Sequence, residues 1–236
     1  MRNARVLTAL GLLAAAGAAH AGVSSTWTVT NDYDFRSYSQ SAKDPALQAS
    51  LDYAHDSGWY VGAWASNVDF GTSDPDLELD LYTGFSKSFD NKFGYDVGVV
   101  YYTYHASPDP SGDFYEAYAG VSYDWVKAKA FYSPDFGGSA TSGNTSAQYI
   151  QVDAAVPLPA NFSVLGHVGY SWGDYWDKSV TDYSAGVGYT AGNFSLALKY
   201  VDNDTSKSDG TRTTEDVFNN EGRVIFTVST TFPCGE

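Results

Sequence analysis

The chain has 236 residues, a length that suits one sizeable barrel or sandwich, or two small domains. Its 28 acidic and 13 basic residues give a formal net charge of −15. This charge argues against a nucleic-acid partner, because phosphates are bound by basic surfaces. The single cysteine, Cys234, excludes an internal disulfide framework and a cysteine-based zinc site. We expect no metal and no cofactor, because the calcium-loop-like run 202–207 has Lys207 where the sharp turn needs glycine, and the glycines at 186–192 are out of register for a dinucleotide site.

Residues 1–21 are typical of a secretory signal peptide. Two arginines precede the apolar run 6–16, and Ala19-His20-Ala21 provides a small-residue cleavage site. The apolar run is shorter than the ~20 residues that a membrane-spanning helix needs. We predict cleavage after this segment, export through the inner membrane, and one mature domain over residues 22–236.

The rest of the chain alternates between apolar and polar residues in stretches of about ten residues, the length of a membrane-spanning strand. In one stretch, the apolar residues Tyr95, Val97 and Val99 interleave with Asp96 and Gly98. A period of two indicates strands with one apolar face. We predict twelve strands, at residues 25–33, 47–54, 59–70, 77–87, 92–104, 114–123, 125–132, 146–156, 162–172, 181–190, 193–201 and 222–232.

The connections between the predicted strands alternate in length. The long ones span residues 34–46, 71–76, 105–113, 133–145, 173–180 and 202–221, and the short ones span residues 55–58, 88–91, 124, 157–161 and 191–192. Aromatic residues on the apolar face gather near both strand ends. Outer-membrane barrels combine these features with an even strand count. We predict an all-β fold: a single antiparallel transmembrane β-barrel with short periplasmic turns, longer extracellular loops and contact with the lipids of a Gram-negative outer membrane.

The strand at 59–70 is ambiguous, because both of its faces are partly apolar. Pairing across the preceding short turn favours Tyr60 and Trp64 on the lipid side. That arrangement would leave Trp59 and Val61 inside and would make part of the lumen dry or plugged.

The inward face of the predicted barrel carries eleven ionisable side chains. We expect the pore-lining residues to be Asp52, Glu78, Asp80, Asp96, Glu116, Lys127, Lys129, Asp153, Asp182, Lys199 and Arg223. In a sealed apolar core these groups would be very costly unless they were paired. They are therefore either solvated by channel water or joined as ion pairs that plug the barrel.

These two arrangements predict different functions. Water between the charges predicts a narrow diffusion channel for small hydrophilic solutes, and the excess of acids predicts mild cation selectivity. A plug predicts a closed structural or adhesive outer-membrane barrel. Twelve strands fall between the small filled barrels and the large open ones, which favours the narrow channel.

A barrel-embedded lipid-modifying enzyme is a third hypothesis, with His105 near Ser107 and Asp109. The spacing of these residues matches no specific motif, and nucleophilic catalysis needs a further group to orient the base. We therefore expect no enzymatic activity.

Residues 31–70 resemble a known protein family. The runs NDYDFRSYSQ at 31–40 and SGWYVGAWASNVDF at 57–70 are similar to the proteobacterial TorF family of porins, also called Gcw_chp. The ending from Gly222-Arg223-Val224 to Thr231-Phe232 resembles that family as well. Two departures are Ser37, where a glycine is usual, and four residues after Phe232. The resemblance implies an outer-membrane barrel, and the aromatic near its C-terminus implies insertion by the barrel-assembly machinery.

Overall fold

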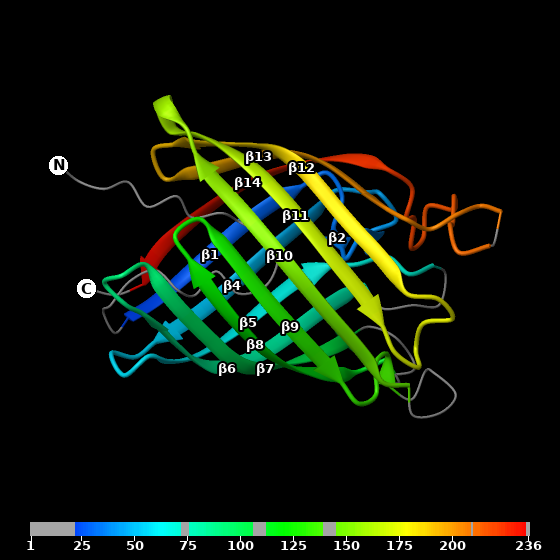
Figure 1. Ribbon diagram of the computed structural model, residues 1–236, viewed down its shortest axis with the longest axis horizontal. Coiled ribbons are helices and arrows are strands. Elements are labelled where there is room, and N and C mark those ends of the chain that lie inside the picture. Colours follow the sequence, from blue (N-terminus) through cyan, green and yellow to red (C-terminus); the bar gives the residue numbers. More distant parts are fainter. Residues whose placement is uncertain (1–21, 72–75, 106–111, 139–144, 209, 235–236) are drawn as a thin grey trace.

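The computed structural model describes residues 22–71, 76–105, 112–138, 145–208 and 210–234, so the predicted signal peptide lies outside the described residues. Twelve strands form one closed antiparallel barrel, which confirms the predicted fold class (Figure 1). They are β1 (Gly22–Thr30), β4 (Ala46–Ala54), β5 (Trp59–Asn67), β6 (Leu77–Ser88), β7 (Phe93–His105), β8 (Phe114–Tyr123), β9 (Val126–Ser133), β10 (Ala147–Pro157), β11 (Phe162–Trp172), β12 (Val180–Ala191), β13 (Phe194–Asn203) and β14 (Arg223–Cys234).

Each barrel strand pairs with its neighbour in the chain, and β1 closes the barrel by pairing with both β4 and β14. Two short strands, β2 (Asp34–Phe35) and β3 (Tyr38–Ser39), form a separate hairpin. A short 3-10 turn, η2 (Pro159–Asn161), connects β10 to β11. No helix in the described residues is long and apolar enough to cross a membrane.

The connections alternate in length as predicted. The short ones lie at one end of the barrel, here called the turn end, and span residues 55–58, 89–92, 124–125, 158–161 and 192–193. The long connections lie at the opposite end, here called the loop end, which is on the right in Figure 1. Gly58, Lys92, Asp124 and Gly192 have positive φ angles, which these tight turns require.

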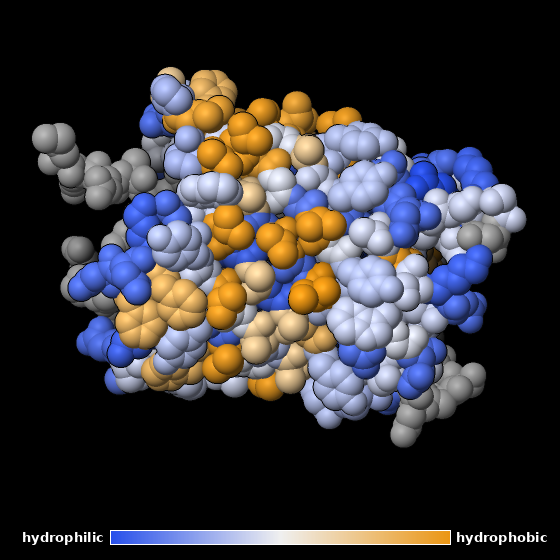
Figure 2. Space-filling model, viewed as in Figure 1, coloured by the Kyte–Doolittle hydropathy of each residue, from blue (hydrophilic) through white to orange (hydrophobic). Residues whose placement is uncertain are grey.

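Outward-facing side chains are apolar along the middle of the barrel. Val97, Leu81 and Val187 are 43%, 50% and 50% exposed. Figure 2 shows orange, apolar residues over the middle of the barrel and blue, hydrophilic residues at both ends. Exposed rings flank the apolar band, namely Trp59, Phe93, Tyr123, Phe162 and Phe194 at the turn end and Tyr101, Tyr115, Tyr132, Tyr170 and Tyr200 at the loop end. This surface has the two aromatic belts expected of a lipid-facing barrel.

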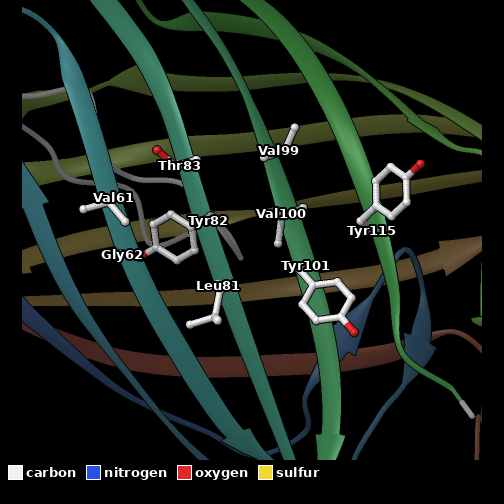
Figure 3. Close-up of a pocket in the computed structure, with 9 residues that line it drawn as sticks. All are labelled: Val61, Gly62, Leu81, Tyr82, Thr83, Val99, Val100, Tyr101 and Tyr115. Carbon is white, nitrogen blue, oxygen red and sulfur yellow. The ribbon is translucent and has the colours of Figure 1, made fainter. Parts of the chain in front are cut away.

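An apolar groove of about 370 Å³ lies on the wall formed by β5 to β8 (Figure 3). Its lining includes Val61, Leu81, Val99, Tyr101 and Tyr115. Gly62 carries no side chain there, and the ring of Tyr82 lies beside it. An apolar lining suits lipid chains rather than polar solutes, so the candidate functional site lies on the inward face.

The predicted facing of the strand at 59–70 is wrong. Tyr60 is 3% exposed and faces inward, whereas Trp59 and Val61 are 44% and 38% exposed and face outward. The turn is the cause of this difference. Ala54 pairs with Tyr60 rather than with Trp59, so the turn is one residue longer than predicted and the register shifts by one residue. The amide of His55 donates to the carbonyl oxygen of Trp59 over 2.8 Å within this turn. A shift of one residue in register moves every side chain to the other face.

Two strand ends also differ from the prediction. β1 ends at Thr30 rather than at residue 33, because Asn31 exchanges hydrogen bonds with the backbone of β14 and the chain then turns inward. β5 ends at Asn67 rather than at residue 70, because Asp69 pairs with Ser41 of the inserted connection. In both places an inward-turning segment takes backbone partners away from the strand.

Arginine in place of Val97 should destabilise the barrel by about 2–4 kcal/mol, because Val97 lies mid-strand on the face expected to contact hydrocarbon. Ala197 is the matched control, since it pairs with Gly188 and Thr227 on the inward face, and Ala197→Arg should cost much less. Equilibrium unfolding of both variants from lipid bilayers measures the difference. Equal costs on the two faces would contradict the assignment of the outward face to lipid.

Candidate functional site in the barrel lumen

Tyrosine side chains cover one side of the inner wall, and glycines on neighbouring strands make room for them. Tyr118 of β8 pairs directly with Gly98 of β7, and a Cβ on Gly98 would collide with the Tyr118 side chain. The hydroxyls of these rings reach acids: Tyr60 donates to Asp96 over 2.6 Å, and the Tyr60 and Tyr118 hydroxyls are hydrogen bonded to each other. Hydrogen bonds therefore fix these tyrosine side chains against the inner wall.

The connection between β1 and β4 folds into the lumen. Its hairpin β2–β3 places the ring of Phe35 6.1 Å from that of Tyr102 of β7, and Arg36 at its tip bonds to Glu116 of β8. On the other side, the Ser37 hydroxyl donates to the carbonyl oxygen of Asp202 in β13 over 2.8 Å. Because β8 and β13 lie nearly opposite each other in the barrel, the hairpin spans the lumen.

The tip of this hairpin is strained. Arg36 and Ser37 have φ angles of 51° and 69°, the left-handed region that a two-residue hairpin turn of this type requires and that Asn-Gly usually occupies. Residues with side chains persist in this region only where their surroundings hold them there. Here the contacts of Arg36 and Ser37 with the barrel wall do so.

Arg36 is held by a buried charge and by aromatic rings. Its Nη2 donates to both carboxylate oxygens of Glu116, at 2.9 and 2.7 Å. The guanidinium carbon lies 4.1 Å from the ring centroid of Tyr149, a cation–π distance, and the Tyr102 hydroxyl donates to Glu116 over 3.0 Å. A buried ion pair is stable only when its remaining polar atoms are satisfied in this way.

Arg223 of β14 makes the second clamp on the hairpin. Its Nε and Nη2 donate to Asp32 and Asp34, each over 2.5 Å, and its Nη1 donates to the Ser37 carbonyl oxygen over 3.0 Å. Asp32 also accepts a hydrogen bond of 2.6 Å from the Ser39 hydroxyl. One guanidinium therefore ties both sides of the hairpin to the barrel wall.

The connection 204–222 covers the hairpin from the loop end. The amide of Ser39 donates to the carbonyl oxygen of Asn219 over 2.8 Å, and both Asn219 and Asn220 are buried. The rings of Phe218 and Phe70 lie 4.7 Å apart, which joins this connection to the one after β5. The described parts of the long connections thus pack on one another.

Burial along the inward face differs between the two ends. Near the loop end, Asp80, Glu116 and Asp182 are at most 2% exposed. Toward the turn end, Lys127 is exposed and Asp52 is only half-buried. Within the described residues, the lumen is filled at the loop end and only partly accessible to solvent at the turn end, where Tyr60, Ser163 and Ser229 are buried.

All eleven predicted residues lie on the inward face, and most of them are paired. Lys129 bonds to Asp96 over 2.5 Å. His167 bridges Asp153 and Asp182 through its two ring nitrogens, at 2.7 and 2.8 Å. The other partners are Arg36 for Glu116, Asp32 and Asp34 for Arg223, and Tyr82 and Ser50 for Asp52. In the described part of the chain, Asp52 has only these hydroxyl partners, and Glu78, Asp80, Lys127 and Lys199 likewise form no ion pair.

Sequence reasoning missed the residues that come from the inserted connection. Arg36, Asp32 and Asp34 stand in a predicted long loop, and nothing in their local pattern indicates that the loop turns inward. His167 could have been found, because it alternates with apolar residues along its strand and so faces inward.

The described residues offer little catalytic chemistry. No group of three histidine, cysteine, aspartate or glutamate side chains gathers there to hold a metal ion. His105 Nε2 lies 2.9 Å from the Thr103 hydroxyl, while Ser107 and Asp109 lie outside the described residues. The geometry therefore adds nothing to the hypothesis of a lipid-modifying enzyme.

The closed twelve-stranded barrel resembles the outer-membrane porins in its fold. Among solved structures, the chain is similar to the KdgM porin, with a TM-score of 0.54 and 8% identity over 90% of this chain and 99% of that one. It is also similar to the NanC porin, with a TM-score of 0.55 and 11% identity over 89% and 98% of the two chains. At these identities the likeness concerns the fold.

The chain belongs to the family described as "Bacterial protein of unknown function (Gcw_chp)", whose model matches residues 14–232. This match confirms the predicted resemblance to Gcw_chp. No curated protein matches the chain.

Replacing Arg36 with methionine should destabilise the protein by about 3–5 kcal/mol, because it leaves the buried carboxylate of Glu116 without its cation. The double variant Arg36→Met/Glu116→Gln should recover part of this loss, since no buried charge is then unpaired. Lys92→Met is the matched control: Lys92 pairs with Asp124 at the exposed turn end, so stability should change little. Urea unfolding of the unaltered protein, Arg36→Met, Glu116→Gln, the double variant and the control measures the coupling, and additive effects of the two single variants would contradict it.

Proposed function

We propose that this protein is a narrow diffusion channel of the Gram-negative outer membrane that passes small hydrophilic solutes. The observation that carries the proposal is a polar, ionisable inner wall, partly accessible from the turn end, inside a barrel with an apolar outer band. A barrel without a water path could be filled with apolar side chains at a much lower desolvation cost. The likeness of the fold to the KdgM and NanC porins supports the same proposal.

The hairpin β2–β3 is the constriction of the proposed channel. It spans the lumen at the loop end and is held there by Arg36 and Arg223, so a solute must pass beside it or displace it. This position explains why the channel would be narrow although twelve strands enclose more space than the small filled barrels do.

The inner wall favours cations in this proposal. The eleven wall residues include seven acids and four bases, and the inserted connection adds Asp32 and Asp34 against Arg36. A mouth with an excess of one charge between low-dielectric walls concentrates counter-ions. We therefore propose mild cation selectivity, set mainly at the loop end.

The proposed partners follow from the barrel and its surface. One KdgM structure contains oligogalacturonate, and we propose that small hydrophilic solutes occupy the lumen here. The apolar band would contact outer-membrane lipids. Export with a cleaved signal peptide and insertion by the barrel-assembly machinery complete the proposal.

A closed structural or adhesive barrel is the second candidate, favoured by the filled loop end. Conductance of the purified protein in a planar bilayer separates the two. The channel should give discrete ohmic steps, whereas silence across independent preparations would favour the closed barrel.

Weakening the constriction should enlarge these steps. In Arg36→Ala the hairpin loses its bond to Glu116 and its contact with Tyr149, so we expect a larger or more often open conductance. Lys92→Ala at the turn end is the control and should conduct like the unaltered protein. An unchanged conductance in Arg36→Ala, with the barrel folded, would contradict the hairpin as constriction.

The reversal potential in a KCl gradient should show a modest preference for K⁺ over Cl⁻. The preference should weaken as the salt concentration rises, because the Debye length falls to ~3 Å near 1 M. Anion preference at low ionic strength would contradict the proposal and would place Lys127, Lys129, Lys199 and Arg223 at the constriction.

A further inference from the structure

Two carboxylates on β6 lie in the filled loop end without a compensating charge. Glu78 is 2% exposed and Asp80 is fully buried. Both oxygens of Asp80 and the Oε2 atom of Glu78 accept no hydrogen bond from the described residues. Buried carboxylates in such a state cost far more free energy than the other acids of this lumen, each of which has a partner.

The Tyr33 hydroxyl is a fourth unpartnered oxygen, and it lies close enough to Glu78 and Asp80 to feel their charges. Tyr33, in the inserted connection, is 5% exposed, and its hydroxyl has no hydrogen-bond partner in the described residues. Burial raises the pKa of this hydroxyl well above its ordinary value, and the negative charges of Glu78 and Asp80 raise it further, so the phenol stays neutral beside them. The Tyr104 hydroxyl donates to Oε1 of Glu78 over 3.3 Å.

The guanidinium groups of the lumen already form ion pairs with other acids. Arg36 bonds to Glu116, and Arg223 bonds to Asp32 and Asp34. Neither forms an ion pair with Glu78 or Asp80. The described residues therefore bring two buried carboxyl groups and a neutral hydroxyl together, and they supply no side-chain cation to pair with either carboxyl group.

We propose that Glu78 and Asp80 hold one divalent hard cation, for which Ca²⁺ is the best match. Calcium takes only oxygen ligands, tolerates irregular geometry, and completes its shell with water, whereas Mg²⁺ demands a near-ideal octahedron. Two carboxylates neutralise its charge. The Tyr33 hydroxyl lies at the rim and donates to a ligating carboxylate or to a bound water.

Such a site has a structural consequence. Tyr33 belongs to the connection that carries the hairpin β2–β3, and its ring packs 5.4 Å from that of Trp64 on β5. A cation between Tyr33 and β6 therefore fastens the base of the hairpin to the wall. This inference concerns metal binding and does not depend on whether the barrel conducts.

Calorimetric titration of the full-length, chelator-treated, refolded protein with CaCl₂ tests the site directly. We expect saturable binding of one Ca²⁺ per chain and its loss in Glu78→Gln/Asp80→Asn, which keeps the side-chain volumes. Asp52→Asn is the matched control, because Asp52 also faces inward but is hydrogen bonded by Tyr82 and Ser50, and it should bind as the unaltered protein does. Tyr33→Phe should weaken binding by about tenfold, as expected for a residue that supports a ligand.

Thermal unfolding gives a second readout that does not require tight binding. Ca²⁺ should raise the melting temperature of the unaltered protein and leave that of Glu78→Gln/Asp80→Asn unchanged. In chelator, this double variant should melt no lower than the unaltered protein, since neither carboxyl group forms an ion pair with a described residue. No saturable Ca²⁺ effect, binding retained in the double variant, or stabilisation of the unaltered protein only by acid would each overturn the proposal.

Discussion

The whole structure depends on the closure of one hydrogen-bonded ladder. β1 pairs with β4 on one side and with β14 on the other, so no strand of the barrel keeps an unpaired edge. In a hydrocarbon environment every backbone polar group needs an internal partner, and a closed barrel provides one. Closure also reverses the usual arrangement of a globular protein, because apolar side chains such as Val97 point outward and polar ones such as Asp96 point inward.

The interior that results combines ion pairs with a buried aromatic cluster that includes Tyr102, Phe114 and Phe136. Arg36 and Arg223 draw an inserted hairpin against Glu116, Asp32 and Asp34, while His167 and Lys129 neutralise acids of the wall. Tyrosines lie over glycines of adjacent strands, which keeps bulky rings against the wall. The filled loop end and the partly accessible turn end follow from this arrangement.

Alternation along single strands predicts a large part of this molecule. The face of Val97 and of its neighbour Asp96 could be assigned from the sequence, since successive side chains of a strand point to opposite sides. The predicted orientation of Tyr60 was wrong, because both faces of its strand are partly apolar and the register depends on the turn after Ala54. The pattern of a strand cannot decide its facing when both faces carry apolar residues, because its pairing is then set by the turn.

The sequence by itself determined the twelve strands, the alternation of turns and loops, and the inward position of eleven ionisable residues, because these depend on local periodicity and on turn chemistry. Only the tertiary structure decided that the hairpin β2–β3 enters the lumen and that Arg36 meets Glu116 across a separation of 80 residues. It also decided that Glu78 and Asp80 form no ion pair with a described residue. A loop carries no periodicity that shows its direction. Its position depends on distant charges that come together only when the barrel closes.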